Sequence, residues 1–260
     1  MMTYFLQKKE IKLKAIILAA GRGKRLTEFS NEINKCMMPF GKQPLIQYSL
    51  DNAVRLDVSE IIIVVGYLAE QIINEYGNYY KDTRIKYVIQ KEQKGLVHAL
   101  GCCKGTIGSN DFILFLGDEF FVGSDHKSLV QRFYEENAFA VCGVIKVKDR
   151  KMISKTYSLL YDNESSRVFR LIEKPQNPLN DLMGSGNIIF KNDIFHYIEK
   201  TPINTHRKEK ELPDLIQCSV DDGKKVLIHL IASEYVNINS PEDITILNKI
   251  VSDTYDKDGI

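Results

Sequence analysis

Three continuous apolar runs in the first half of the chain alternate with amphipathic segments. The runs are KAIILAA at 14–20, EIIIVV at 60–65 and DFILFLG at 111–117. Continuous β-branched and aliphatic runs of this kind are typical of strands that are buried on both faces. Helix-like stretches lie near 43–55, 68–80 and 95–105. This alternation predicts a parallel sheet with right-handed crossovers, whose ligands gather at the carboxyl ends of the strands.

The second half of the chain has a more mixed pattern. Its predicted elements are a hairpin of YSLLYD (157–162) and RVFRLIEKP (167–175), a strand at 186–190, a helix near 191–199, a helix at 208–220, a strand at 225–231 and a last helix from Ser240. No linker rich in proline or glycine divides the chain. We therefore predict one domain over residues 1–260. Its expected fold is three-layer α/β, with a mostly parallel central sheet and helices on both faces.

Composition and charge exclude several classes of protein. The 260 residues include 35 basic and 34 acidic side chains, and this balance argues against a nucleic-acid binder that works by bulk charge. No apolar run approaches the ~20 residues of a membrane helix, and the first residues lack a signal-peptide pattern. We therefore expect a cytoplasmic protein that binds neither nucleic acid nor membrane. The cysteines form no C-x-x-C pair and the histidines show no ligand spacing, so we interpret them as free thiols and as structural or surface residues.

A loop rich in glycine and basic residues, LAAGRGKRL at 18–26, directly follows the first predicted strand. Gly21 and Gly23 allow positive φ and a close approach of backbone N–H groups to an anion. Three cations follow within four residues at Arg22, Lys24 and Arg25, and Lys35 comes shortly after them. The combination predicts a site for several phosphate oxygens.

Two common phosphate-binding motifs do not fit this loop. The string G-x-x-x-x-G-K-[ST] of a P-loop is absent. A dinucleotide-binding fingerprint requires a third glycine where this chain has Leu26, and an acidic residue after the second strand where it has Gly66. The loop therefore belongs to another kind of phosphate site.

LAAGRGKRL, together with KCMMPFGKQPLI, resembles the signature of the sugar-1-phosphate nucleotidylyltransferases. The resemblance implies the Rossmann-like fold of the nucleotide-diphospho-sugar transferases. It implies that Arg25 and Lys35 are catalytic and contact the triphosphate and the attacking phosphate. It also implies a nucleotide-binding N-terminal half and a sugar-phosphate-binding C-terminal half.

Further motifs follow in the order of that family over residues 14–247. QKEQKGLVHAL is similar to its base-recognition segment, FLGDE to its magnesium motif L-G-D-N, RLIEKP and SGNIIF to its sugar site, and YVNINSPEDI to its closing motif. The resemblance implies these roles: nucleotide binding by Ala20, Gly21, Gly23, Gln90, Gly95 and Gly117, sugar-phosphate binding by Glu173, Lys174 and Gly186, and Mg²⁺ binding by Asp118 and Asn237. Gln90 carries two donors and an acceptor, which suit a pyrimidine edge.

Several positions depart from the family pattern. Asn237 replaces the aspartate that is the second metal ligand, and Glu119 replaces the asparagine of L-G-D-N. Ser158 replaces a glycine beside the sugar, Tyr235 a tryptophan and Asn239 a glycine. We therefore hypothesise that the sugar phosphate is a modified or unusual one.

The implied reaction transfers a nucleotidyl group from a nucleoside triphosphate, with dTTP or UTP favoured, to a sugar 1-phosphate. Two alternatives stay open. One is cytidylyl transfer to phosphocholine or a similar non-sugar phosphate, and the other is a catalytically silent nucleotide-sugar-binding paralogue. Family members are often dimers or tetramers, so the resemblance also leaves a homo-oligomer open.

Overall fold

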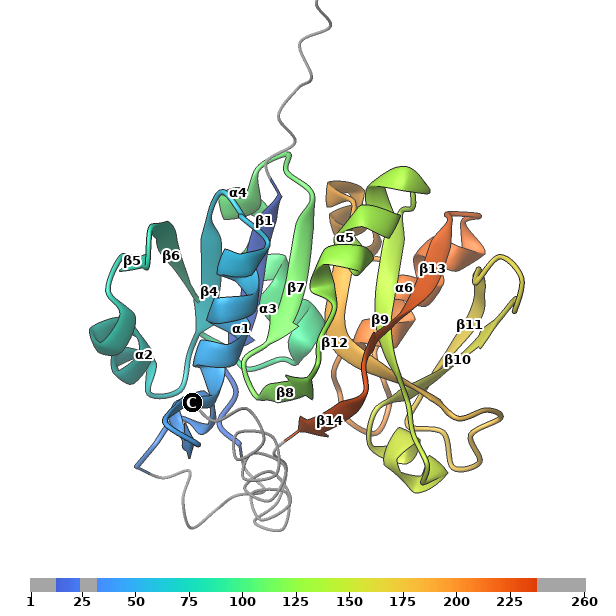
Figure 1. Cartoon of the computed structure of the whole chain (residues 1–260), viewed down its shortest axis with the longest axis horizontal. Helices are drawn as coiled ribbons and strands as arrows, with labels where there is room; N and C mark the ends of the chain where they lie inside the picture. Colours follow the sequence, from blue (N-terminus) through green and yellow to red (C-terminus); the bar gives the residue numbers. More distant parts are fainter. Residues whose placement is uncertain (1–12, 24–31, 238–260) are drawn as a thin grey trace, which may run out of the picture.

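A ten-stranded mixed sheet forms the centre of the computed structural model, which describes residues 13–23 and 32–237 (Figure 1). Its parallel part contains β1 (Lys14–Ala19), β4 (Ile61–Val65), β6 (Thr83–Ile89) and β7 (Phe112–Leu116). β1 lies between β4 and β7, β6 pairs with β4, and the short β5 (Tyr79–Tyr80) closes this edge antiparallel to β6. The carboxyl ends of the four parallel strands therefore meet at one edge of the sheet.

The second half of the chain completes the sheet around one long strand, β12 (Leu182–Phe190), which runs antiparallel to β7. The other strands of this half are β9 (Ala140–Lys146), β10 (Tyr157–Tyr161), β11 (Val168–Glu173) and β13 (Val226–Ala232). β12 pairs with β9 on one side, and on its other side with β7 near one end and with β10 near the other. β10 and β11 form the predicted hairpin, and β13 runs parallel to β9.

Helices cover both faces of the sheet, which confirms the three-layer α/β fold (Figure 1). One face packs against α1 (Leu45–Arg55), α2 (Ala69–Tyr76) and α5 (His126–Glu135). The other face packs against α3 (Leu96–Cys102), α4 (Lys104–Ile107) and α6 (Leu212–Asp221). Alternate residues of β1 point to opposite faces of the sheet: Ile17 lies in the core that contains α1, and Ile16 lies in the core that contains α3. This double burial explains the continuous apolar runs.

Short elements complete the structure. They are the 3₁₀ helices η1 (Lys35–Met37), η2 (Arg150–Lys155) and η3 (Asn192–Tyr197), the pair β2 (Pro39–Phe40) with β3 (Gln43–Pro44), and the pair β8 (Glu119–Val122) with β14 (Glu234–Asn237). Because β8 follows β7 directly, its pairing with β14 brings the end of the described chain beside the ends of the parallel strands.

Some expected boundaries were wrong. The helix predicted at 68–80 ends at Tyr76, because Gly77 takes a positive φ of 54° and β5 follows. The helix predicted at 208–220 begins only at Leu212, and the segment expected at 191–199 is the 3₁₀ helix η3. The predicted last helix lies outside the described residues. In the described part of the chain, no helix is long and apolar enough to cross a membrane.

Candidate active site

A cavity of about 490 Å³ lies at the carboxyl ends of the parallel strands and reaches across to β12 and the start of α6. Most of the residues assigned to the site from sequence line it: Ala20, Gly21, Gly23, Lys35, Gln90, Gly95, Asp118, Glu173, Lys174 and Gly186. Gly117 is not part of the lining, although Leu116 and Asp118 on either side of it are. Arg25 and the side chain of Asn237 lie outside the described residues.

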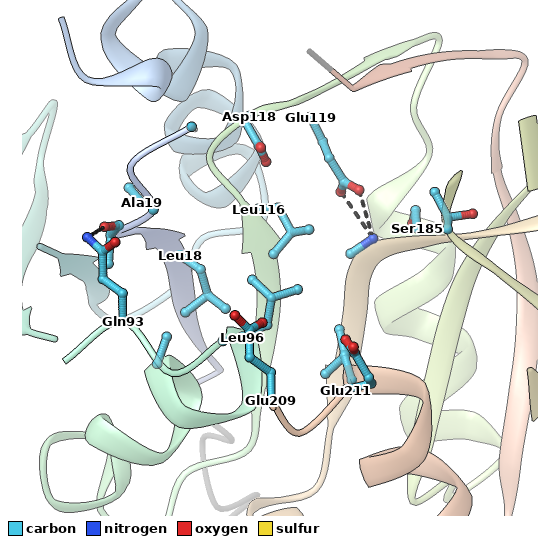
Figure 2. Close-up of a pocket in the computed structure, with 18 of the residues that line it drawn as sticks. Leu18, Ala19, Gln93, Leu96, Leu116, Asp118, Glu119, Ser185, Glu209 and Glu211 are labelled. Carbon is cyan, nitrogen blue, oxygen red and sulfur yellow. Dashed lines mark hydrogen bonds between the residues drawn. The ribbon is translucent and has the colours of Figure 1, made fainter. Parts of the chain in front are cut away.

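An opening in the sheet creates room for this cavity. β7 pairs with β12 over Ile188–Phe190, whereas β10 pairs with it at Gly184. Neither strand covers 185–187, and Ser185 and Gly186 face the cavity. The backbone N–H of Gly186 consequently donates to the Glu119 carboxylate, at 3.0 and 3.1 Å from its two oxygens, rather than to a neighbouring strand (Figure 2).

The glycine-rich loop after β1 is held by residues that follow the neighbouring strands. The Ala20 carbonyl oxygen accepts hydrogen bonds from Tyr67 N at 3.2 Å and from Gln93 Nε2 at 2.9 Å (Figure 2). Gly23 has a φ of 66°, in the left-handed region that glycine allows. The Arg22 guanidinium lies 5.1 Å from the centre of the Tyr67 ring. The loop thus presents backbone and a cation to the cavity.

Lys35 reaches the cavity because Asn34 fixes the short helix that carries it. The fully buried Asn34 accepts a hydrogen bond from Cys36 N at 2.9 Å and donates one to the Tyr67 carbonyl at 2.7 Å. Lys35 Nζ lies 2.6 Å from Asp118 Oδ2, so the ammonium and the carboxylate form an ion pair. Asparagine immediately before a helical turn is a helix-start signal, by which this positioning residue could have been found in the sequence.

Gln90 follows β6 and is only 5% exposed. Its Nε2 lies 3.1 Å from the Gly95 carbonyl oxygen and 2.9 Å from His98 Nδ1. Gly95 has a φ of 89°, and a Cβ there would lie 2.7 Å from Glu209 Oε2. Both the backbone conformation and the close approach therefore require glycine at this position.

Glu119 is a fully buried carboxylate that connects three elements. Besides Gly186 N, it accepts hydrogen bonds from Asn187 Nδ2 at 2.8 Å and from Tyr235 OH at 2.8 Å. Burial, reinforced by the neighbouring Asp118, raises the pKa of Glu119 to about 7 against the lowering effect of these donors. Departures from the family pattern at two positions, Glu119 and Tyr235, thus lie in one hydrogen-bonded network.

The opposite end of the cavity has a second cluster of charges. Arg207 Nη1 lies 2.9 Å from Glu173 Oε1 and 2.9 Å from Glu211 Oε1, and Lys174 Nζ lies 3.7 Å from Glu173 Oε1. Burial and the nearby Glu211 raise the pKa of Glu173 to about 7, while Lys174 and Arg207 lower it. Glu209 and Glu211 face the cavity from the side opposite Asp118 and Glu119 (Figure 2).

The donor set near Asp118 suits magnesium better than a metal that needs many protein ligands. Within the described residues, no group of three or more His, Cys, Asp or Glu side chains could hold a metal ion. Mg²⁺ is commonly held by one or two carboxylates, waters and substrate phosphates. Asp118 faces the cavity, and the backbone of Asn237 pairs with the adjacent Glu119.

Comparison with known proteins identifies the family. The sequence model of the nucleotidyl transferase family matches residues 14–235. This chain belongs to the nucleotidyl transferase family. It is a nucleotidyltransferase, and its resemblance to the sugar-1-phosphate nucleotidylyltransferases is confirmed by named relatives.

Relatives of this nucleotidyltransferase differ in the nucleotide that their names give. It is 32% identical to the UTP–glucose-1-phosphate uridylyltransferase AglF of Haloferax volcanii, over 89% of this chain and 93% of that protein. It is 28% identical to a glucose-1-phosphate thymidylyltransferase of Streptomyces griseus, over 93% of this chain and 67% of that protein. It is 32% identical to the bifunctional protein GlmU of Methanococcus maripaludis, over 92% of this chain but only 56% of that protein.

Solved structures share the fold of this nucleotidyltransferase. A UDP-glucose pyrophosphorylase in complex with UDP-glucose has a TM-score of 0.82 at 22% identity, over 93% of this chain and 99% of that one. A putative glucose-1-phosphate thymidylyltransferase of Bacillus anthracis also has a TM-score of 0.82 at 22% identity, over 92% and 94% of the two chains. These likenesses confirm the fold class.

Arg207, Glu209 and Glu211 are cavity residues of this nucleotidyltransferase that were not predicted. They lie on the loop before α6, in or beside a segment expected to be helical. Acidic and basic residues in such a segment are typical of an exposed helix face, so the sequence alone carries no signal for them.

Proposed function

We propose that the enzyme transfers a nucleotidyl group from UTP or dTTP to a sugar 1-phosphate, producing an NDP-sugar and pyrophosphate. One observation carries the proposal: the glycine-rich loop, the Lys35–Asp118 pair and the Glu173–Lys174 pair all line a single cavity. A cavity that combines phosphate-binding groups with a separate cluster of charged side chains around Glu173 suits two substrates that must meet.

The nucleoside triphosphate would bind at the ends of β1 and β6. Ala20, Gly21 and Gly23 offer backbone to the phosphates, and Gln90 and Gly95 are available to the base. The name of AglF supports UTP and that of the Streptomyces griseus protein supports dTTP. Both nucleotides carry a pyrimidine base with an N3–H.

The sugar phosphate would bind between β12 and the loop before α6. Lys174 would neutralise its phosphate, Glu173 would accept hydrogen bonds from its hydroxyl groups, and the sugar ring would lie against Gly186. Glu173 already binds Arg207, so hydroxyl groups would share this carboxylate with a cation. Substituents on the sugar would contact the same charged cluster of Arg207, Glu173 and Glu211.

The chemistry is a displacement at phosphorus. A sugar-phosphate oxygen forms a bond to the α-phosphorus of the triphosphate, and the bond to the bridging oxygen of the leaving pyrophosphate breaks. The attacking phosphate is already ionised, so positioning and charge neutralisation matter more than a general base. Lys35 would bridge the α-phosphate and the sugar phosphate, and Arg25 would steady the leaving pyrophosphate.

Asp118, together with Asn237 and substrate phosphates, would hold Mg²⁺. The ion, when bound, supplies positive charge next to the reacting phosphates. Lys35 Nζ lies 2.6 Å from Asp118 Oδ2, so the same carboxylate that would hold the ion also positions this ammonium beside the phosphate-binding loop.

The phosphocholine alternative has little support. A choline headgroup is bound by an aromatic or acidic cage. Among the described residues that line the cavity, Tyr157 is the only aromatic one, and its hydroxyl donates to the Ser185 carbonyl at 2.9 Å. The nearby carboxylates Glu173 and Glu211 both bind Arg207.

A pyrophosphate-release assay with Mg²⁺, each nucleoside triphosphate and a panel of sugar 1-phosphates and phosphocholine tests the proposal. We expect release with UTP or dTTP and a sugar 1-phosphate. Within the panel, a clear preference for plain glucose 1-phosphate would refute the hypothesis of a modified sugar. No release with any pair would favour the catalytically silent paralogue instead.

A further inference from the structure

The orientation of the Gln90 carboxamide is determined by two neighbours on the protein side. Nε2 lies 3.1 Å from the Gly95 carbonyl oxygen. A carbonyl oxygen only accepts hydrogen bonds, so the amide nitrogen, and not the amide oxygen, must face Gly95. The opposite orientation would bring two acceptor oxygens together.

The second amide N–H of Gln90 then points to His98 Nδ1, 2.9 Å away. Because an amide nitrogen only donates, His98 Nδ1 is the acceptor in this hydrogen bond. His98 lies in the first turns of α3, directly after Gly95, and is not among the described residues that line the cavity. It therefore acts on the cavity only through Gln90.

Both donors of Gln90 are used within the protein, which leaves Oε1 as the atom available to a ligand. None of the described residues donates a hydrogen bond to this oxygen, and Gln90 lines the cavity. From the sequence, the Gln90 carboxamide could offer a base two hydrogen-bond donors and one acceptor. In the structure, only the acceptor oxygen remains available to the base.

We propose that His98 is a positioning residue that holds Gln90 Oε1 toward the nucleobase, so that the site selects uracil or thymine over cytosine. Uracil and thymine carry a hydrogen at N3 and can donate it to Oε1. Cytosine has a lone pair at N3, which would face the lone pairs of Oε1. The inference rests on the proposed function, because it requires a nucleoside triphosphate whose base lies beside Gln90.

Two substitutions separate the acceptor at His98 from the shape of its ring. His98→Phe keeps a ring but removes the acceptor, so one Gln90 N–H loses its partner and the Gly95 carbonyl alone holds the carboxamide, which then rotates more freely. His98→Asn restores an acceptor, since Asn Oδ1 is as many bonds from the backbone as His Nδ1. A folding defect would lower turnover of all nucleotides together, so the ratio between two nucleotides reports on Gln90.

The experiment measures kcat/KM for UTP, dTTP and CTP at saturating sugar 1-phosphate in the wild-type enzyme and both variants. We expect the wild type to prefer UTP or dTTP over CTP by about 100-fold, in line with one mismatched buried hydrogen bond. His98→Phe should lower this ratio at least ~10-fold, mainly through KM, and His98→Asn should keep it within about threefold of wild type. An unchanged ratio in His98→Phe, or an equal loss in both variants, would overturn the proposal.

Equilibrium binding distinguishes failure of this inference from failure of the proposed function. Calorimetric titration of UTP and of CTP, without sugar phosphate, requires no turnover. We expect the ratio of the affinities for UTP and CTP to be high in the wild type and in His98→Asn, and to be lower in His98→Phe. If no pair of substrates releases pyrophosphate, the proposed reaction fails, while the binding ratios still support or overturn the role of His98.

Discussion

Lys35 and Asp118 lie 83 positions apart in the chain, yet their charged groups are 2.6 Å apart and both residues line the cavity. Lys35→Ala is expected to lower kcat/KM by at least ~100-fold, because it removes a charge that stabilises the transition state. Arg25→Ala should cause a loss of similar size. Steady-state kinetics at saturating Mg²⁺ checks both, and Lys42→Ala, an exposed lysine in the turn after β2, is the matched control. Wild-type rates in either cavity variant would refute the assigned role.

Asp118→Asn should change the dependence on metal more than the affinity for nucleotide. The substitution removes the charge that would hold Mg²⁺ and also the partner of Lys35. We expect the Mg²⁺ concentration for half-maximal rate to rise at least ~10-fold, and chelation of the metal to abolish turnover in the wild type. A Mg²⁺ titration of the initial rate measures this. An unaltered titration curve would mean that Asp118 is not a ligand.

Gly186→Ala should introduce a steric conflict on the sugar side. A Cβ at Gly186 would lie 2.2 Å from Leu116 Cγ and 2.9 Å from Glu119 Oε2. Overpacking of this kind costs about 1–3 kcal/mol, and we expect a lower free energy of unfolding together with a higher KM for the sugar phosphate. Gly105→Ala, where a Cβ meets nothing within 4 Å, is the control. The double variant Gly186→Ala/Leu116→Ala should recover part of the loss in denaturant unfolding, and no recovery would contradict this steric explanation.

Arg207→Ala should weaken the binding of the sugar phosphate more than the binding of the nucleotide. The side chain bridges Glu173 and Glu211 at 2.9 Å each, so its loss leaves two largely buried carboxylates to repel each other. We expect KM for the sugar 1-phosphate to rise by about 10-fold and KM for the nucleotide to change little. His206→Ala, on the same loop but outside the cavity lining, provides the comparison. Equal changes in both KM values would argue against a local role.

His126 should make the protein less stable in acid. Its Nε2 lies 2.7 Å from Asn187 Oδ1, and burial lowers the pKa of the imidazole to about 4. As pH falls below 6.5, the unfolded chain takes up a proton that the folded protein does not. Stability from this group is therefore lost between pH 6.5 and pH 4, by up to about 3 kcal/mol.

Denaturant unfolding across that pH range measures the effect. His126→Gln retains a donor for Asn187 but cannot titrate, so its stability should fall less steeply toward pH 4 than that of the wild type. His196→Gln replaces a histidine whose side chain is 71% exposed and should follow the wild-type slope. If the free energy of unfolding fell equally steeply with pH in all three proteins, His126 would not contribute to the loss of stability in acid.

The sequence predicted the parallel part of the sheet well, because β1, β4 and β7 are buried on both faces and read as unbroken apolar runs. β9, with AVCGVIK, carries a similar run and could have been predicted by the same rule. β6 could not, since most of its residues are only partly buried and its pattern is weak. α5 has a capping Asp125, but its apolar stripe is short.

The site was predictable where local motifs carry it. Gly21, Gly23 and Lys35 were singled out because residue type and spacing are themselves the signal, whereas Asp118 and the Glu173–Lys174 pair followed from the resemblance to family motifs; all of them line the cavity. Arg207 was missed because its partner Glu173 lies 34 positions earlier in the chain, and only the fold brings the two together. The inward orientation of Glu119 toward Gly186 likewise depends on the gap between β7 and β10.

The proposed reaction joins a nucleoside triphosphate to a sugar 1-phosphate in this cavity. The most direct measurement follows the phosphorus atoms by ³¹P NMR during incubation of the enzyme with UTP or dTTP, Mg²⁺ and a sugar 1-phosphate. We predict that the two signals of an NDP-sugar diphosphate and the signal of pyrophosphate appear together in equal molar amounts, and that Lys35→Ala slows the appearance of both by at least ~100-fold. Pyrophosphate without an NDP-sugar, or an NDP-sugar formed equally fast by Lys35→Ala, would contradict the proposed reaction and the role of Lys35.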